Sequence, residues 1–238
     1  NIPLTARGRA SGTTGGAIPL QGGLVLSLER LDKILDYDPK NRIMIVEPGV
    51  LNETIQKKAA TDNFFWAPDP SSGSFCTVGG NLACNAAGPR SIKYGTTREN
   101  TLGLKAVIGD GQLLKSGVHT TKGVVGYDFT RLLIGSEGTL GIITEAVLKL
   151  MPKPEAKQTL CAIYRSVDGA VQAIVDVMSQ PVIPCALEMM DAMSVDLIRH
   201  HEHAAFSDEA KALLIIEVDG SRASLKMEVD GVAASLKN

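Results

Sequence analysis

RGRASGTTGG, residues 7–16, brings four glycines, three hydroxyl side chains and two arginines together in ten positions. Glycine is costly to order, and it is favoured where φ must be positive or where another group approaches the backbone closely. Two interpretations of this stretch stay open. It is a surface loop made of tight turns, or its amides and hydroxyls form a phosphate cradle with arginine as the counter-charge.

The composition of the chain is that of an ordinary globular protein. Its 238 residues are 44% hydrophobic and 21% charged, which is enough for one large domain or two small ones. The net charge of −2 argues against nucleic acid as a partner. The aromatic content of 4% argues against a stacking platform for single strands.

The four cysteines, at positions 76, 84, 161 and 185, show neither a CxxC pair nor zinc-knuckle spacing. We interpret them as small buried thiols in a reducing compartment. No signal peptide is visible and no apolar run is long enough to cross a bilayer, so we expect a cytoplasmic protein, or one peripheral to the inner membrane. The sequence lacks an initiator methionine and opens directly before the glycine-rich stretch, so we also expect a fragment.

Strand and helix patterns alternate along the first half of the chain. They predict strands over 24–28 and 42–49, a short helix or turn over 30–35, a helix over 51–60, a hairpin over 104–117 around Asp110-Gly111, a helix over 130–134 and a strand at the end of 135–150. Residues 67–96 carry almost no periodicity. Their small residues and lack of charge runs favour an ordered, buried loop.

A Pro- and Lys-rich joint at 151–157 predicts a boundary between domains 1–152 and 153–238. Beyond it, strand patterns at 159–166, 185–191 and 212–220 alternate with helix patterns at 167–180, 193–203 and from 221 onward. This β-α-β-α-β-α run predicts the start of an α+β, ferredoxin-like layer.

Standard catalytic and nucleotide motifs are absent. GDGQLL at 109–114 falls in the predicted hairpin and lacks the last glycine of GxGxxG, and GSEG at 135–138 lacks the spacing of a nucleophile elbow. His200 and His203 stand one helical turn apart, but we interpret them as a solvated helix end and predict no metal site. His119, alone in a polar loop, is expected at the surface.

Four glycine-bearing segments remain, at 7–16, 67–75, 79–95 and 135–143. None carries an obvious nucleophile, a pair of carboxylates or a metal cage. Structural loops could explain any one of them, whereas four together favour an extended, anionic, aromatic ligand that contacts the backbone along the chain. The protein would then bind and orient a cofactor that brings its own reactivity.

These segments resemble, in this order, the PCMH-type FAD-binding domain of the vanillyl-alcohol oxidase superfamily. The likeness rests on RGRASGTTGGAIP (7–19), APDPSS (67–72), CTVGGNLACNAAGPRSIKYG (76–95) and GSEGTLGIITEAVLKLMPKP (135–154). It is greatest to the branch of the glycolate oxidase catalytic subunit and D-lactate dehydrogenase, and LEMMD (187–191) resembles a segment of that branch's substrate domain. The resemblance implies a PCMH-type domain followed by the start of a substrate domain, in a chain truncated at both ends.

The resemblance also implies a set of FAD-binding residues. The pyrophosphate loop would comprise Arg7, Gly8, Arg9, Ala10, Ser11, Gly12, Thr13, Thr14, Gly15 and Gly16. The flavin and ribityl chain would be lined by Pro68, Asp69, Thr77, Gly79, Gly80, Asn81, Asn85, Ala86, Ala87 and Gly88, with Tyr94 and Gly95 in the same cofactor-binding set. The adenine end would lie near Glu137, Gly138, Gly141, Ile142 and Ile143.

Two departures from the family pattern bear on the cofactor. Many members carry glycine where Ala10 and Ala87 stand, and alanine costs little there only if φ is negative. Members that attach FAD covalently use a histidine or cysteine near these loops. No histidine precedes His119, and Cys76 and Cys84 stand where non-covalent members carry small residues, so we expect non-covalent FAD.

The implied activity is the oxidation of a D-2-hydroxy acid, of the glycolate or D-lactate type, to the 2-oxo acid. A hydride would pass to FAD, and electrons then to a quinone, a cytochrome or a flavoprotein subunit, in a homo- or hetero-oligomer. No catalytic residue is assigned. The alternatives are a non-catalytic FAD-binding subunit, an inactive fragment, an NADPH-dependent cell-wall enolpyruvyl reductase, or a glycine-rich domain without a cofactor.

Overall fold

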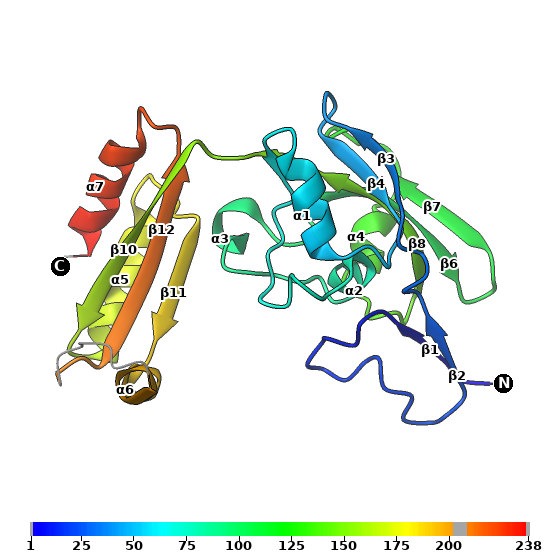
Figure 1. The fold of residues 1–238 in the computed structure, drawn as a ribbon, viewed down its shortest axis with the longest axis horizontal. Coiled ribbons are helices and arrows are strands. Elements are labelled where there is room, and N and C mark those ends of the chain that lie inside the picture. Colours follow the sequence, from blue (N-terminus) through cyan, green and yellow to red (C-terminus); the bar gives the residue numbers. More distant parts are fainter. Residues whose placement is uncertain (1, 202–208, 237–238) are drawn as a thin grey trace. The chain divides into compact units, whose positions relative to one another are not determined.

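The computed structural model describes residues 2–201 and 209–236, which form two compact units, Asn1–Lys153 and Pro154–Asn238 (Figure 1). In the first unit the strands are Leu4–Arg7 (β1), Leu24–Ser27 (β2), Ile34–Asp38 (β3), Ile43–Val46 (β4), Phe64–Phe65 (β5), Thr101–Ile108 (β6), Leu113–Gly117 (β7), Gly141–Lys149 (β8) and Met151–Pro152 (β9). Its helices are Asn52–Ala60 (α1), Val78–Ala83 (α2), Ser91–Tyr94 (α3) and Phe129–Leu133 (α4). Over the described ranges, no helix has the length and apolar character needed to cross a bilayer.

A five-stranded antiparallel sheet in the order β3-β4-β8-β6-β7 forms the centre of the first unit. The apolar run of β4 is almost wholly buried, as expected for an inner strand. The hairpin of β6 and β7 turns at Asp110-Gly111 as predicted, because Gly111 supplies the positive φ that the turn requires. Ile55 of α1, Leu82 of α2 and Leu148 of β8 share one buried core with the fully buried Trp66.

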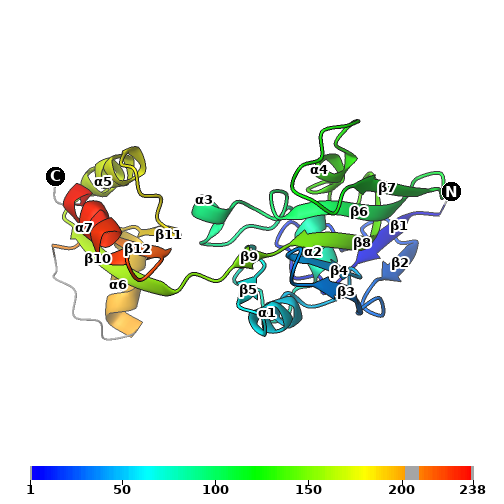
Figure 2. The ribbon, with the colours of Figure 1, turned by 90° about the horizontal axis from the view of Figure 1, so that it is seen from above.

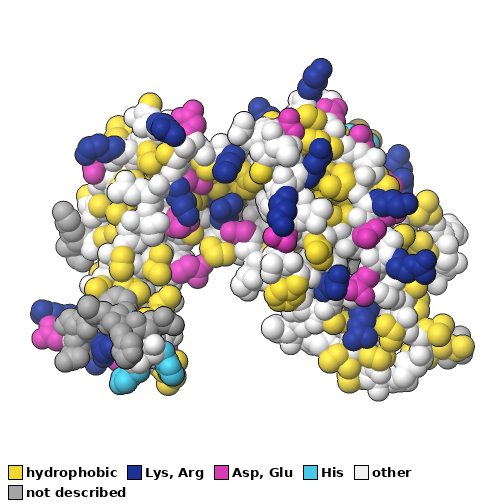
Figure 3. Space-filling view, in the orientation of Figure 1, with side chains coloured by type: hydrophobic (Ala, Val, Ile, Leu, Met, Phe, Trp, Pro, Cys, Tyr) yellow, Lys and Arg dark blue, Asp and Glu magenta, His cyan; other side chains and the backbone are white. Residues whose placement is uncertain are grey.

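Strands β1 and β2 form a separate parallel pair, in which Leu4 lies opposite Leu24. The chain between these strands, residues 8–23, contains most of the glycine-rich stretch. Leu4, Leu24, Val25 and Leu26 are all exposed, and Figure 3 shows hydrophobic side chains on the surface around this part of the unit. The pair therefore positions the 7–16 loop without belonging to the main core.

The second unit follows the predicted β-α-β-α-β-α order. Its elements are Ala156–Tyr164 (β10), Val167–Ser179 (α5), Ala186–Met190 (β11), Ala192–His201 (α6), Ala212–Gly220 (β12) and Leu225–Ser235 (α7). The three strands form an antiparallel sheet in the order β10-β12-β11. Helices α5 and α7 bury Ala173 and Val229 against one face, whereas α6 packs Val195 against the other (Figure 2). The mixed α and β architecture confirms the predicted fold class.

Three local expectations are refined or corrected by the structure. Of the helix or turn predicted over 30–35, the structure has a turn at its start, where the Leu31 N–H donates to the Leu28 carbonyl (3.0 Å), and the last residues open strand β3, which pairs with β4. The segment 67–96 is ordered but contains the short helices α2 and α3. Cys76 and Cys185 are buried as expected, whereas Cys84 and Cys161 are exposed, because they lie at the end of α2 and on strand β10. His203 and the end of the predicted 193–203 helix lie outside the described residues.

Candidate cofactor site

A cavity of about 180 Å³ opens between the 7–16 loop, helix α2 and the turn at 136–138. All four glycine-bearing segments, far apart in the sequence, therefore contribute to one cavity, the 67–75 segment through Ser72. A second cavity of about 40 Å³ shares Ala6, Leu28 and Gly79 with it. Pockets that enclose a whole drug-sized ligand are roughly 300–1,000 Å³, so this cavity has room for only part of a ligand as large as a dinucleotide.

The 7–16 loop reaches helix α2 through close backbone packing at Gly8. A Cβ atom on Gly8 would lie only 2.5 Å from Thr77 Oγ1. That oxygen is already engaged, since it accepts a hydrogen bond from the Gly80 N–H (3.3 Å) and caps the N-terminus of α2. The glycine at position 8 is therefore explained by packing between two loops, without any ligand.

Gly12 and Gly16 differ from Gly8 because a Cβ atom there would contact its nearest neighbour without a clash. The nearest atom to a Cβ on Gly12 is Cys84 Sγ at 3.9 Å, and the nearest to one on Gly16 is Glu137 Oε2 at 3.7 Å. All four residues line the cavity, and neither glycine has φ in the left-handed region. A Cβ atom at either position would therefore make ordinary van der Waals contact with the opposite wall, and glycine keeps this part of the cavity free of side chains.

Helix α2 ends in a Schellman motif that connects it to the 84–88 segment. The Ala86 N–H donates to the Asn81 carbonyl (2.8 Å), and the Asn85 N–H donates to the Leu82 carbonyl (3.1 Å). Asn85 adopts the left-handed conformation with φ +47°, which asparagine tolerates better than most residues. The turn after α4 packs on the same helix end, because the Glu137 N–H donates to the Ala83 carbonyl (2.9 Å).

The charges around the cavity are of both signs. Arg7 and Arg9 line it on the loop side, and Glu137 lines the opposite wall. Arg9 Nε lies 2.9 Å from Glu29 Oε1 in an exposed ion pair. Burial, and then the negative charge of Glu137, raise the pKa of the Cys84 thiol. Cys84 therefore faces the cavity as a neutral thiol near pH 7, the form with the lower nucleophilicity.

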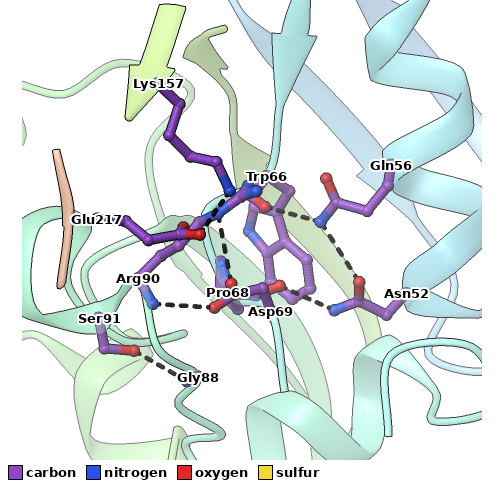
Figure 4. Close-up of polar contacts among 10 residues, drawn as sticks. All are labelled: Asn52, Gln56, Trp66, Pro68, Asp69, Gly88, Arg90, Ser91, Lys157 and Glu217. Atoms are coloured by element: carbon purple, nitrogen blue, oxygen red, sulfur yellow. Dashed lines mark hydrogen bonds and ion pairs between the residues drawn. The ribbon is translucent and has the colours of Figure 1, made fainter. Parts of the chain in front are cut away.

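Behind α2, a buried polar network holds the 66–70 segment (Figure 4). Asn52 of α1, only 2% exposed, donates through Nδ2 to the Pro68 carbonyl and to Asn81 Oδ1, both at 3.1 Å. Gln56 Nε2 donates to the Trp66 carbonyl (2.7 Å) and to Asn52 Oδ1 (3.3 Å). Since Asn81 lines the cavity, this network fixes a cavity residue from behind.

A second set of contacts holds the other side of the same segment. Asp69 Oδ1 accepts from the Arg90 N–H (3.3 Å), and Asp69 Oδ2 lies 3.4 Å from Arg90 Nε. The Gly88 N–H donates to Ser91 Oγ (3.0 Å). Figure 4 shows these contacts beside the Asn52 network, and it also draws the ion pair of Lys157 and Glu217 in the second unit.

The structure brings a majority of the predicted cofactor residues to the two cavities. The larger cavity is lined by Arg7, Gly8, Arg9, Ala10, Ser11, Gly12, Thr14, Gly16, Thr77, Gly79, Gly80, Asn81, Ala86, Glu137 and Gly138. The smaller one is lined by Gly141, Ile142 and Ile143, together with Gly79 and Gly138. The remaining predicted residues line neither cavity: Thr13, Gly15, Pro68, Asp69, Asn85, Ala87, Gly88, Tyr94 and Gly95.

Several lining residues were not predicted. They are Ala6, Ala17, Leu28, Pro48, Ser72, Ala83 and Cys84. Ser72, Ala83 and Cys84 lie inside segments that the glycine pattern singles out. The others are mostly small or apolar residues of neighbouring elements, and nothing in the local sequence distinguishes them from core residues.

The two alanines that depart from the family pattern differ in conformation. Ala10 has φ +52°, in the left-handed region, whereas Ala87 is not among the described residues with positive φ. An L-residue other than glycine is strained by roughly 1–2 kcal/mol in that region. The condition for a harmless alanine therefore holds at position 87 and fails at position 10.

Two protein families match the chain in tandem. Residues 1–117 match the family described as FAD binding domain, and residues 153–238 match the family described as FAD linked oxidases, C-terminal domain. The chain therefore belongs to the FAD-linked oxidases of the PCMH-type superfamily, and FAD is the cofactor of its first domain.

Two of the relatives are named for the 2-hydroxy acids glycolate and D-lactate. The glycolate oxidase subunit GlcD of Bacillus subtilis is 41% identical over 219 residues, covering 92% of this chain and 47% of the relative. The D-lactate dehydrogenase of Anaerostipes hadrus is 38% identical over 190 residues, covering 80% of this chain and 40% of the relative. The chain thus spans about half the length of these relatives.

A solved structure has the same fold over nearly the whole chain. Alkyldihydroxyacetonephosphate synthase superposes with a TM-score of 0.82 at 25% identity, covering 98% of this chain and 45% of that one. Both units are therefore represented in the fold of that solved structure.

Proposed function

We propose that the cavity binds part of FAD without a covalent bond, and that the enzyme containing this chain oxidises a D-2-hydroxy acid to the 2-oxo acid. The observation that carries the proposal is the cavity of about 180 Å³ that Gly12 and Gly16 line together with Cys84 and Glu137. A diphosphate needs such space beside backbone amides, together with a cation. Arg7 lies on the same cavity wall.

Each part of the cavity has a separate task in this proposal. The amides of the 7–16 loop and the hydroxyls of Ser11 and Thr14 donate hydrogen bonds to the diphosphate, and Arg7 balances its charge. The apolar side cavity, with Ile142 and Ile143 in its wall, holds the adenine end. Pro68, Asp69 and the 85–88 segment orient the flavin end.

When bound, FAD supplies the acceptor for the hydride that leaves the substrate α-carbon. The residues of this chain bind and orient that cofactor and exclude water from it. The raised pKa of the Cys84 thiol lowers its nucleophilicity, which supports non-covalent binding of FAD in this proposal. The base that takes the hydroxyl proton is not assigned to any described residue.

The electrons leave through a partner in this proposal. The acceptor is a quinone, a cytochrome or a flavoprotein subunit, and the similarity to GlcD, which is named as a subunit, favours a hetero-oligomer. The competing function is an FAD-binding subunit without its own turnover. Both functions need bound FAD, but only the oxidation of a hydroxy acid requires that the substrate reduce this FAD.

The visible absorbance spectrum of the purified chain with added FAD tests the proposal. We expect a bound-flavin spectrum that bleaches without oxygen when D-lactate or glycolate is added. A bound flavin that neither acid reduces would favour the non-catalytic subunit. Absence of bound flavin at FAD concentrations far above the micromolar range would contradict the proposed site.

A further inference from the structure

Arg98, in the segment between α3 and β6, contacts the C-terminal end of α2 and the turn that follows α4. Its guanidinium Nη2 donates to the carbonyl oxygen of the buried Ile134 (2.8 Å). Its backbone N–H donates to Asn85 Oδ1 (3.0 Å). One residue therefore ties the 134–138 turn to the C-terminal end of α2.

The 134–138 turn is shaped to accept this arginine. A Cβ atom on Gly135 would lie 2.8 Å from Arg98 Nη2 and 3.3 Å from Asn85 Cβ, so the guanidinium occupies the space that a side chain would need. Gly135 has φ +85°, and its N–H donates to the Leu82 carbonyl (2.9 Å). The turn is thus held from two sides, by α2 and by Arg98.

We propose that Arg98 is a positioning residue of the cofactor cavity, and that it holds Glu137 and Gly138 in place facing the 7–16 loop. This inference rests on the proposed function. Arg98 does not itself line either cavity, so it acts through Ile134 and Asn85.

The arginine is costly for a purely structural role. Its Nε is buried and has no hydrogen-bond partner within the part of the chain that the structure describes. A buried N–H group without a partner lowers stability. An apolar side chain would fill the same space without that cost but would leave the Ile134 carbonyl without this donor.

Hydrogen exchange and FAD binding of Arg98→Met and Arg98→Lys test the proposal, with Arg131→Met as the control. Arg131 is an exposed arginine of α4 whose ion pair with Asp128 stays within its own helix end. We expect Arg98→Met to raise the FAD dissociation constant about tenfold or more, as for the loss of one hydrogen bond to a charged group. Arg98→Lys keeps the positive charge but loses the planar guanidinium group with its fixed N–H donors. Its FAD affinity should therefore lie between those of the unmodified chain and Arg98→Met.

Exchange of the backbone amides in the chain without FAD separates positioning from simple destabilisation. We expect faster exchange at Gly135 and Glu137 in Arg98→Met, with unchanged exchange in strand β8. Equal acceleration in β8, or unchanged exchange at Gly135 and Glu137, would overturn the proposal. So would faster exchange at this turn with unchanged FAD affinity. If the unmodified chain binds no FAD, the proposed function fails, and the exchange data alone decide whether Arg98 holds the turn.

Discussion

At the scale of single residues, Gly12 and Gly16 are the positions where side-chain size decides what the cavity holds. Alanine at either position is compatible with the backbone, and its methyl group would project toward Cys84 or Glu137 at 3.9 or 3.7 Å. We expect each substitution to raise the FAD dissociation constant on the order of tenfold or more, with little loss of stability. Gly109→Ala is the matched control, because a Cβ there meets nothing within 4 Å and lies outside the cavity. Unchanged FAD titrations for both variants would place the diphosphate elsewhere.

Ala10 carries a strain that glycine would relieve. Because its φ is +52°, we expect Ala10→Gly to raise the free energy of unfolding by about 1 kcal/mol. Ala87→Gly is the control of opposite sign, since Ala87 is not among the described residues with positive φ and glycine there only adds unfolded-state entropy, about 0.5–1 kcal/mol. Urea denaturation measures both. A loss of stability in Ala10→Gly would show that the loop gains nothing from this relief.

The residues that support the site are the ones that sequence patterns fail to reveal. Gly12, Gly16 and Glu137 stand in glycine-bearing segments, which a pattern can detect. Asn52 and Arg98 stand in ordinary helix and loop sequence, and their importance comes from carbonyl groups of Pro68 and Ile134 that are distant along the chain. Contacts of this kind are set by packing, so local composition carries no sign of them.

At the scale of elements, α1 and the 66–70 segment depend on each other through Asn52. Asn52→Ala leaves the Pro68 carbonyl and Asn81 Oδ1 without this donor in a buried place. We expect the free energy of unfolding to fall by about 2–3 kcal/mol. Lys57→Ala on the same helix removes only an exposed i,i+4 ion pair, and should cost about 0.5 kcal/mol. Equal losses in the two variants, measured by denaturant unfolding, would contradict the role of the network.

Tyr37 links strand β3 to the end of α1 in a pH-dependent way. Its hydroxyl donates to Asp62 Oδ2 (2.8 Å). Burial, and then Asp62 through its hydrogen bond and charge, raise the pKa of Tyr37 from 10.0 to about 12. Because the folded pKa is the higher one, the stabilisation is complete below pH 10 and is lost as the pH rises to about 12. The free energy of unfolding, measured across this pH range, should fall as the pH rises, and the fall should be smaller in Tyr37→Phe.

Elements that are encoded by their own residues could be predicted from the sequence, whereas elements that form through contacts with distant residues could not. The hairpin of β6 and β7 is encoded by Asp110-Gly111 and the apolar runs beside it, so its sequence suffices. Strand β3 is rich in Asp and is formed by pairing with β4, which residues 30–35 do not reveal. Helix α2 contains Gly79 and Gly80, poor helix formers, and gains its caps from Thr77 and from the distant 135–137 turn.

At the scale of the whole molecule, the two units differ in what they contribute. Every residue that lines the two cavities lies between Ala6 and Ile143, within the first unit. The second unit has a hydrophobic core of its own, formed by α5, α7 and the β10-β12-β11 sheet. The Pro- and Lys-rich joint and the change of pattern beyond it are visible in the sequence, and the domain boundary drawn from them stays a prediction. The cavity needs contacts among separated loops, so its shape is not visible there.

Separate cores predict separate responses to the cofactor. A ligand that binds only the folded state stabilises it by RT ln(1 + [L]/Kd), about 2.7 kcal/mol at a hundredfold excess over Kd. We expect calorimetry of the intact chain to show two transitions, of which FAD raises only that of the first unit. Leu214→Ala removes a fully buried side chain of β12. It should lower the free energy of unfolding of the second unit by about 2–5 kcal/mol and leave the FAD affinity unchanged. A single transition that moves as a whole with FAD and with Leu214→Ala would show instead that the two units unfold together, and that the cofactor stabilises both.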